Sequence, residues 1–260
     1  MSHQPRKRFG QHFLIDPTVL TEIIRCLNLQ KTDRVIEIGP GQGALTEFLL
    51  SQVDHLDVIE LDRDLVEFLK QHYDENKITI HAADALDFSY SSLSNNKFDL
   101  RIVGNLPYNI STPLLFKLFD EINFICDMHF MLQKEVVLRL TAEVGTTDYG
   151  RLSVMSQYFC DNHDLFSVAP DAFDPPPKVE SAVVRLVPKK NQQTLSPKQF
   201  KQFSDVVKEA FNYRRKKLGN ALQRLIDAKT LATLNIDPNL RPQDISVDEF
   251  IRISQAISIE

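Results

Sequence analysis

The chain has 260 residues, of which 43% are hydrophobic and 25% charged, as in a globular protein with one main domain and a smaller second one. No apolar run is long enough to span a bilayer, and no apolar segment of a secretory signal follows the polar first eight residues, so we expect a cytoplasmic protein without a membrane partner. The net charge of −5, taken alone, disfavours a nucleic-acid partner.

The first half of the chain alternates short apolar segments with amphipathic ones. Asp16-Pro17 is a typical helix start, because a capping carboxylate precedes proline, and apolar residues with helical spacing follow. The pattern then predicts strands at 34–38, 57–61, 78–81, 100–103 and 128–132, and helices at 43–52, 63–72, 112–119 and 134–142. This alternation predicts an α/β fold, with a parallel sheet covered by helices on both faces.

The rest of the chain is predicted to hold two late strands, a linker and a helical segment. Residues 154–159 and 181–186 are expected strands that could pair as antiparallel edge strands. Residues 188–197 are polar and flanked by proline, as linkers often are. Beyond them we expect only helices, at 197–211, at 214–226, near Leu231 and at 247–258. The sequence thus predicts an α/β domain over residues 1–190 and a small helical domain over 191–260.

A glycine-rich turn, with the sequence VIEIGPGQG, follows the first strand of the predicted sheet at 35–43. Gly39 and Gly41 would let the backbone approach a ligand closely. Glu60 ends the next strand, where it could accept hydrogen bonds from a ribose, and Asp84 follows the third, where it could read an adenine edge. The spacing differs from the G-x-G-x-x-G of dinucleotide sites, and Glu37 suits a cofactor with a positive sulfonium and no phosphate, S-adenosylmethionine. A purely structural turn is the alternative.

The segment GNLPY closes the fourth predicted strand at 104–108, and ligands of open α/β sheets bind beyond the carboxyl ends of the strands. The Asn105 side-chain oxygen and the Leu106 carbonyl could accept the two hydrogens of an adenine N6 amine, which would free its lone pair to attack a methyl group. Pro107 would fix that carbonyl, and Tyr108 offers a stacking face. Catalysis would depend on proximity and charge placement. The alternative is a simple turn with Tyr108 in the core.

Phe173 lies in a proline-stiffened loop with the sequence DAFDPPP, at 171–177. An aromatic side chain at this point could cover the second face of an adenine that has been flipped out of its stack. The alternative is a loop anchor that packs on the hydrophobic core. We include Phe173 among the candidate catalytic residues.

Positive charge is concentrated in two short runs, at 6–8 and at 214–217. A local basic face can bind phosphates on an acidic protein, because screening limits the reach of each charge to about 8–10 Å. The second run is expected to open the helix at 214–226, where four consecutive cations cannot all face one way. The candidate RNA-binding residues are Arg214, Arg215, Lys216 and Lys217. A solvated helix face is the alternative.

The cysteines and histidines indicate neither disulfides nor a metal. The three cysteines, Cys26, Cys126 and Cys160, are scattered along the chain and form no Cys-x-x-Cys pair. The seven histidines show no ligand spacing either, so we expect reduced cysteines and no bound metal.

Taken together, these motifs resemble the ribosomal RNA adenine N6,N6-dimethyltransferases, and most closely their bacterial small-subunit branch. The resemblance covers nearly the whole chain and rests on RFGQHFL (8–14), IEIGPGQGALT (36–46), VIELDRDL (58–65), GNLPYNISTP (104–113), MLQKEV (131–136), YGRLSV (149–154), PPPKVESAVVRL (175–186) and FNYRRKKL (211–218). It implies a Rossmann-like, S-adenosylmethionine-dependent methyltransferase sheet. It also implies that the substrate is two adjacent adenosines near the 3′ end of 16S ribosomal RNA, in the small subunit or its precursor.

The resemblance further implies site roles. His12 and Leu14 would help to close over the cofactor, and its pocket would be lined by Gly39, Glu60, Asp84 and Asn105. The family often has asparagine where this chain has His12, which adds a question of protonation.

Three other functions stay open. One is methylation of an adenosine in large-subunit RNA, and another is a non-catalytic ribosome-assembly factor on the same fold. The third is a nicotinamide dehydrogenase, which fits the glycine spacing and the GNLPY segment poorly. We expect a monomer.

Overall fold

The structure is a computed structural model that describes residues 12–190 and 195–257, so the basic run at 6–8 and part of the expected linker lie outside the described residues. Its contacts divide the chain into two compact units. The first holds the described residues up to Val137 together with Asn162–Pro188, and the second holds Leu138–Asp161 and the described residues from Lys189 onward. Residues 138–161 thus group with the C-terminal helices. The sequence analysis predicted a single boundary at residue 190 and did not predict this grouping.

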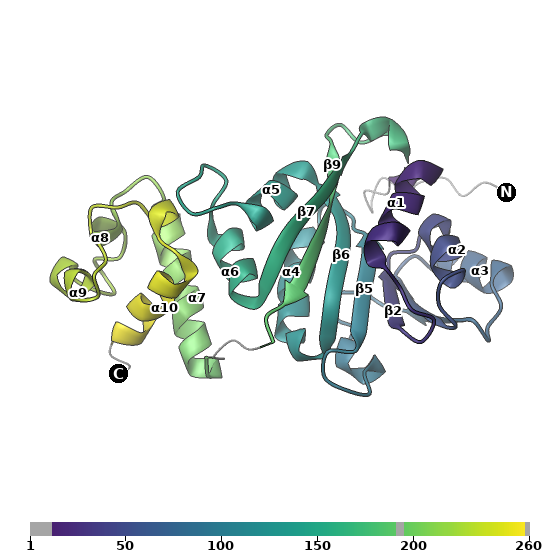
Figure 1. The fold of residues 1–260 in the computed structure, drawn as a ribbon, viewed down its shortest axis with the longest axis horizontal. Coiled ribbons are helices and arrows are strands. Elements are labelled where there is room, and N and C mark those ends of the chain that lie inside the picture. Colours follow the sequence, from purple (N-terminus) through teal and green to yellow (C-terminus); the bar gives the residue numbers. More distant parts are fainter. Residues whose placement is uncertain (1–11, 191–194, 258–260) are drawn as a thin grey trace. The chain divides into compact units, whose positions relative to one another are not determined.

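A mostly parallel sheet of seven strands forms the centre of the fold (Figure 1), in the order β4-β3-β2-β5-β6-β9-β7. The pairs from β4 to β6 are parallel, and β9 runs antiparallel to β6. The strands are β2 (Arg34–Ile38), β3 (Leu56–Glu60), β4 (Ile78–Ala82), β5 (Leu100–Asn105), β6 (Ile125–Gln133), β7 (Cys160–Val168) and β9 (Ser181–Pro188). The predicted α/β sheet is confirmed. Two short strands that the sequence did not predict, β1 (Phe13–Leu14) and β8 (Phe173–Asp174), pair antiparallel.

The helices around the parallel strands form where the sequence predicts them. They are α1 (Pro17–Leu27), α2 (Ala44–Leu50), α3 (Arg63–His72), α4 (Ser111–Asp120) and α5 (Lys134–Thr141). Asp16 caps α1 by accepting a hydrogen bond of 2.7 Å from the backbone N–H of Thr18, which satisfies a donor at the helix start. Asn28 then ends the helix in the left-handed conformation.

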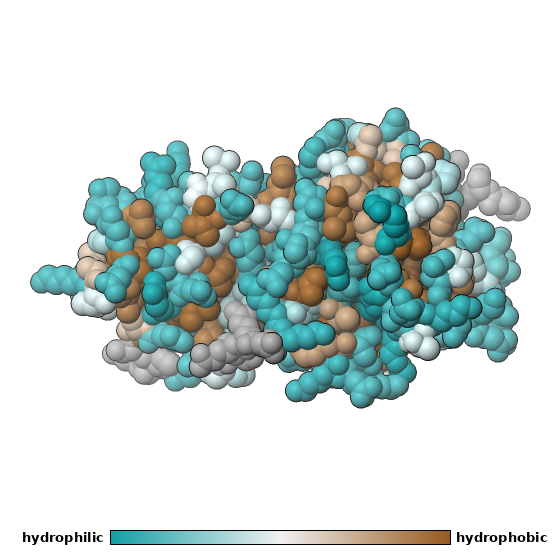
Figure 2. Space-filling view, in the orientation of Figure 1, coloured by the Kyte–Doolittle hydropathy of each residue, from teal (hydrophilic) through white to brown (hydrophobic). Residues whose placement is uncertain are grey.

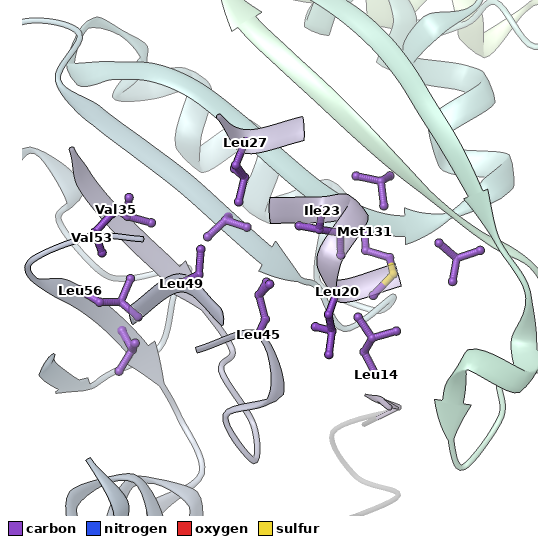
Figure 3. Close-up of a cluster of buried hydrophobic side chains, with 14 of the residues drawn as sticks. Leu14, Leu20, Ile23, Leu27, Val35, Leu45, Leu49, Val53, Leu56 and Met131 are labelled. Atoms are coloured by element: carbon purple, nitrogen blue, oxygen red, sulfur yellow. The ribbon is translucent and has the colours of Figure 1, made fainter. Parts of the chain in front are cut away.

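A hydrophobic cluster joins α1 and α2 to one face of the sheet. Leu20, Ile23 and Leu27 of α1 are buried and spaced three or four residues apart, so they share one helix face. Figure 3 shows Leu20 and Ile23 beside Met131 of β6, with Leu45 and Leu49 of α2 nearby. This packing holds the two helices against one face of the sheet, because the non-polar side chains leave water together.

The strand order reverses between β2 and β5. The chain passes from β2 outward through β3 to β4, then returns to β5 on the other side of β2 and continues to β6. In open parallel sheets the crevice for a ligand lies beyond the carboxyl ends of the strands at such a point. Gly39 follows β2 and Asn105 ends β5, so the two predicted motifs meet at this crevice.

The second unit is helical, with α6 (Arg151–Phe159), α7 (Pro197–Asn212), α8 (Leu218–Ala221), α9 (Ala228–Thr233) and α10 (Val247–Ala256). The strand expected at 154–159 is wrong, because these residues belong to α6. The Ser153 hydroxyl accepts a hydrogen bond of 2.9 Å from the Gly150 N–H at the start of this helix. Val154, Met155 and Tyr158 are buried with helical spacing. The strand begins only at Cys160.

The helix expected at 214–226 is also wrong, because only the single turn α8 forms within it. The chain leaves α7 in a turn closed by a 2.7 Å hydrogen bond from the Lys216 N–H to the Tyr213 carbonyl. The N–H groups of Leu218 and Gly219 then donate to the carbonyls of Leu240 and Pro238. Bonds to a distant segment thus replace the first turn of the expected helix.

On the face shown in Figure 2, hydrophilic residues surround small separate groups of apolar ones. The most exposed large apolar side chains among the described residues are Ile15 and Leu61. Within 12–190 and 195–257, no helix is both long enough and apolar enough to cross a membrane.

Candidate active site

A cavity of about 340 Å³ opens in the first unit, at the carboxyl ends of β2 and β5. Its wall contains most of the residues that the sequence analysis singled out, namely His12, Leu14, Gly39, Gly41, Asn105, Leu106, Pro107 and Tyr108. The glycine turn and the GNLPY segment therefore face one common space, as the order of the strands requires.

The glycine turn has a backbone that only glycine adopts easily. Gly39 and Gly41 have φ angles of 67° and 58°, in the left-handed region where a Cβ atom is disfavoured. A Cβ atom on Gly41 would also lie 2.9 Å from the Phe13 ring. The turn thus lets β1 pack directly on the cavity wall.

Glu60 is tied to the backbone around the glycine turn. Its buried carboxylate accepts hydrogen bonds from the N–H groups of Gly41 at 3.3 Å and Asp62 at 2.9 Å. Burial raises the pKa of Glu60, although these N–H groups oppose the shift. Glu60 is absent from the described cavity wall, and so is Asp84, whose carboxylate accepts from the Leu86 N–H at 2.9 Å. Glu60 ends β3 and bonds to the wall residue Gly41, and Asp84 follows the neighbouring strand β4.

Asn105 is held by the segment that precedes β1. Its side-chain amide donates a hydrogen bond of 2.9 Å to the backbone carbonyl of His12, which leaves the side-chain oxygen as an acceptor. Leu106 is buried, and its N–H donates to the Met131 carbonyl at 3.2 Å. The two acceptors assigned to the amine site thus belong to a fixed strand end.

Tyr108 makes two contacts that fix its ring. Its hydroxyl lies 2.8 Å from the Ser181 hydroxyl, and its ring lies 5.8 Å from the His12 ring, at an angle of 28°. The Nδ1 atom of His12 in turn lies 2.7 Å from the Pro175 carbonyl. Partial burial raises the pKa of Tyr108, so the hydroxyl keeps its proton at neutral pH. His12 therefore contacts both Asn105 and Tyr108.

Phe173 lies in the hydrophobic core of the first unit. Only 2% of it is exposed, and it packs in the same hydrophobic cluster as Leu14, its partner in the pairing of β1 with β8. Phe173 is not among the described residues that line the cavity. This placement favours the anchor interpretation over a stacking face for a base.

Two further buried titratable side chains lie on the cavity wall: Glu37, which the sequence analysis related to a cationic cofactor, and His129, to which it assigned no role. Glu37 accepts a hydrogen bond of 2.6 Å from the Thr46 hydroxyl, and burial raises its pKa to about 8. His129 of β6 is likewise buried, and burial lowers its pKa to about 4. The sequence did contain an indication for His129. It lies two residues before the cavity residue Met131 in β6, so the two side chains point to the same face of the strand.

The four cations at 214–217 lie in the second unit, in and after the turn that follows α7. Arg214 donates to the carbonyls of Thr147 and Tyr149, so its guanidinium stabilises a neighbouring loop. The Lys216 ammonium lies 4.5 Å from the centre of the Tyr213 ring, and Lys217 donates to Asn239 at 2.9 Å. Arg215 is exposed. Because the run occupies a turn, its cations are not confined to the positions of a helix.

Among the described residues, no group of three or more His, Cys, Asp or Glu side chains is arranged to hold a metal ion.

Comparisons with known proteins show which family the chain resembles. Residues 2–258 match the model of a family described as ribosomal RNA adenine dimethylase. The ribosomal RNA small subunit methyltransferase A of Coxiella burnetii (strain CbuG_Q212) is 58% identical over 254 residues, which cover 97% of this chain and 98% of that protein. The protein of the same name from Dechloromonas aromatica (strain RCB) is 49% identical over 256 residues, 98% of this chain and 99% of that one.

Solved structures share the architecture. A dimethyladenosine transferase from Plasmodium falciparum superposes with a TM-score of 0.79 at 25% identity, over 93% of this chain and 96% of that one. The 23S rRNA methyltransferase ErmE superposes with a TM-score of 0.70 at 22% identity, over 94% and 99% of the two chains, which is a likeness of fold. The match to the family model across nearly the whole sequence shows that this chain belongs to the ribosomal RNA adenine dimethylase family.

Proposed function

We propose that this chain transfers methyl groups from S-adenosylmethionine to the N6 amines of two adjacent adenosines near the 3′ end of 16S ribosomal RNA, giving N6,N6-dimethyladenosines. The observation that carries the proposal is the position of Asn105. Its side-chain oxygen is left as an acceptor at a cavity that also borders the glycine turn. Modification of small-subunit RNA gives the chain a role in biogenesis of that subunit, as a monomer in the cytoplasm.

The residues present fit S-adenosylmethionine. The turn at Gly39, where a Cβ atom would meet nothing within 4 Å, would accept the close approach of a ligand, and Glu60 has further lone pairs for ribose hydroxyls beside the backbone donors that it binds. Asp84 would contact the adenine, and Glu37, which lines the cavity, would ionise more readily beside a cation. When bound, S-adenosylmethionine supplies an electrophilic methyl group on a positive sulfonium.

The chain's own residues prepare the amine. An adenine N6 is a poor nucleophile, because its lone pair is delocalised into the ring. Asn105 Oδ1 and the Leu106 carbonyl accept its two hydrogens, which favours a pyramidal nitrogen with an available lone pair. The Tyr108 ring, fixed by Ser181, offers the base a stacking face. Catalysis then needs only proximity and fixed dipoles, since the methylated N6 is cationic and loses a proton readily.

The C-terminal part of the chain, which the sequence analysis predicted as a domain over residues 191–260, is assigned to RNA binding. Its exposed cations Arg215 and Lys216 lie in the turn after α7 and would contact phosphates. Arg214 would act indirectly, because its hydrogen bonds to Thr147 and Tyr149 fix the loop beside the turn.

Transfer of a labelled methyl group to purified ribosomal subunits tests the proposal. The parent protein should label the RNA of unmethylated small subunits and leave large subunits unlabelled. Label in the large subunit would instead indicate an enzyme that methylates an adenosine of large-subunit RNA. Absence of label in both, with normal binding of small-subunit RNA, would indicate a non-catalytic assembly factor.

A further inference from the structure

His129 is a buried polar side chain without a hydrogen-bond partner. It is 1% exposed, and neither ring nitrogen has a hydrogen-bond partner in the described part of the chain. Its Nδ1 atom lies 3.9 Å from a carboxylate oxygen of Asp127, which is too long for a hydrogen bond. Buried polar groups normally have a partner, and an unpaired one destabilises the fold. The hydrogen-bond partner of the ring therefore comes from a ligand group or a water, because the described residues alone do not supply one.

The pairing of the strands places His129 on the floor of the cavity. Glu37 of β2 lies opposite Val103 of β5, and Val103 lies opposite His129 of β6. All three line the cavity. Because neighbouring strands are about 4.8 Å apart, the two polar residues flank Val103 at a separation of about 10 Å. This row is two residues before Asn105 on β5, so it lies about 7 Å deeper along the strand.

The charges near His129 keep its ring neutral. Burial is the main reason that its pKa is lowered to about 4; Asp127 opposes this shift, and Arg185 and Arg101 support it. Asp127 is bound by Arg101 at 2.8 Å, so its carboxylate is largely neutralised. A neutral imidazole has one nitrogen that donates and one that accepts. The ring can therefore accept a hydrogen bond from a cation at neutral pH.

We propose that His129 is a further cofactor-binding residue. It accepts a hydrogen bond, directly or through one water, from the ammonium of the amino-acid end of S-adenosylmethionine. The inference rests on the proposed function, which places the reacting methyl group near Asn105 and leaves the deeper row for another part of the cofactor. The second polar group of the row is the carboxyl of Glu37, which a bound ammonium would help to ionise, and which would then attract the ammonium and repel a carboxylate.

Two ligands that differ only at the amino-acid end test this assignment. S-adenosylhomocysteine has that end, whereas 5′-methylthioadenosine keeps the adenosine and the sulfur but lacks it. The variant His129→Leu replaces the ring by an apolar side chain of similar size. By calorimetry, we expect it to bind S-adenosylhomocysteine about ten-fold more weakly, and to bind 5′-methylthioadenosine with an affinity within about two-fold of the parent.

Stability supplies a second readout. Without ligand, His129→Leu should unfold at the same temperature as the parent or higher, because it removes an unpaired buried polar group. His129→Gln keeps an acceptor and should recover part of the affinity for S-adenosylhomocysteine. Met131→Leu changes an apolar residue of the same wall and should not distinguish the two ligands.

Equal weakening of both ligands by His129→Leu would overturn the assignment, and so would an unchanged affinity for S-adenosylhomocysteine. If the leucine variant does not fold, ¹⁵N resonances of the His129 ring in the parent decide the question. They should shift on addition of S-adenosylhomocysteine and not of 5′-methylthioadenosine, and an identical response to both would contradict the proposal. A parent protein that binds neither S-adenosylmethionine nor S-adenosylhomocysteine would instead contradict the proposed function.

Discussion

The cavity of the first unit and the basic turn of the second unit show two different ways in which a protein presents functional groups. At the proposed amine site of the cavity, two polar side chains are fixed by hydrogen bonds, Asn105 by the His12 carbonyl and Tyr108 by Ser181. At the turn, Arg214 is bound to backbone carbonyls, whereas Arg215 is exposed. Chemistry on one amine needs fixed groups, while phosphate binding tolerates mobile ones, because its attraction is electrostatic and weakly directional.

The largest effect is expected at the fixed amine site. Asn105→Ala should lower the rate of methyl transfer by about a hundred-fold or more, as removal of a preorganised polar group commonly does. Its affinity for the cofactor should change far less, since the contact with the amine is strongest in the transition state. Single-turnover kinetics at saturating cofactor measure the rate. A rate within a few-fold of the parent, or a defect confined to binding, would rule out the assigned role.

The next effect concerns the cofactor side of the cavity. Glu60→Ala should weaken binding of S-adenosylmethionine by about ten- to a hundred-fold, because a charged acceptor is removed. The same carboxylate binds the N–H groups of Gly41 and Asp62, so Glu60→Gln, which keeps one acceptor oxygen, should be less impaired. Calorimetry measures both variants. An unchanged affinity in folded Glu60→Ala would contradict the ribose contact.

Glu37 should make the stability of the fold depend on pH. Its pKa of about 8 in the folded protein lies above the ordinary value of 4.5, so folding favours its protonated form. The resulting stabilisation is complete below pH 4.5 and is lost as the pH rises to about 8, by at most about 1.4 kcal/mol per pH unit. Glu37→Gln cannot ionise and should flatten this dependence in denaturant titrations. An equally steep dependence in the variant would show that other groups cause it.

A smaller effect on affinity is expected at the basic turn. Arg215→Ala with Lys216→Ala should weaken binding to small subunits. It should also make the slope of log affinity against log salt shallower by about 0.7–0.9 for each phosphate that the variant no longer binds. Affinity for the cofactor should stay at the parent value. Arg214→Ala is the matched comparison, because it should lower the thermal stability of the fold more than it lowers the affinity for small subunits. A parental salt slope in the double variant would identify the turn as an ordinary solvated surface.

The smallest effect is expected from the Tyr108 hydroxyl. Tyr108→Phe keeps the stacking ring and removes only the bond to Ser181, so the rate should fall by a few-fold at most. Ser181→Ala should have a similar effect, and the two changes together should cost no more than one alone, because they remove the same bond. Tyr108→Ala removes the ring and should weaken RNA-dependent activity more. Abolition of activity by Tyr108→Phe would mean that the hydroxyl acts on the substrate.

The two regions also differ in how far the sequence could predict them. The strand at 34–38 and the helix at 63–72 form with the expected bounds, because alternation and caps act within a few residues. The cavity residues could be predicted because strand ends of a parallel sheet meet at one edge. The helix expected at 214–226 fails because Leu218 and Gly219 bind distant carbonyls, and no local pattern contains that information.

Within the first unit, too, the features that the sequence could not predict depend on contacts between distant segments. Phe173 is aromatic whether it stacks on a base or packs in the core, and only the pairing of β1 with β8 places it in the hydrophobic cluster. The isolation of His129 depends on the register of β5 and β6. In the second unit, residues 154–159 are apolar enough for either a strand or a helix, and such short runs cannot be distinguished by periodicity alone.

Mass spectrometry of small-subunit ribosomal RNA tests most directly whether methylation depends on the fixed amine site. Unmethylated small subunits would be incubated with S-adenosylmethionine and either the parent protein or Asn105→Ala, and the RNA would then be digested to nucleosides and fragments. We expect the parent to convert two adjacent adenosines near the 3′ end to N6,N6-dimethyladenosine, and Asn105→Ala to leave them almost unmodified over the same time. Methylation at another atom or in another RNA, or full dimethylation by Asn105→Ala, would contradict this assignment.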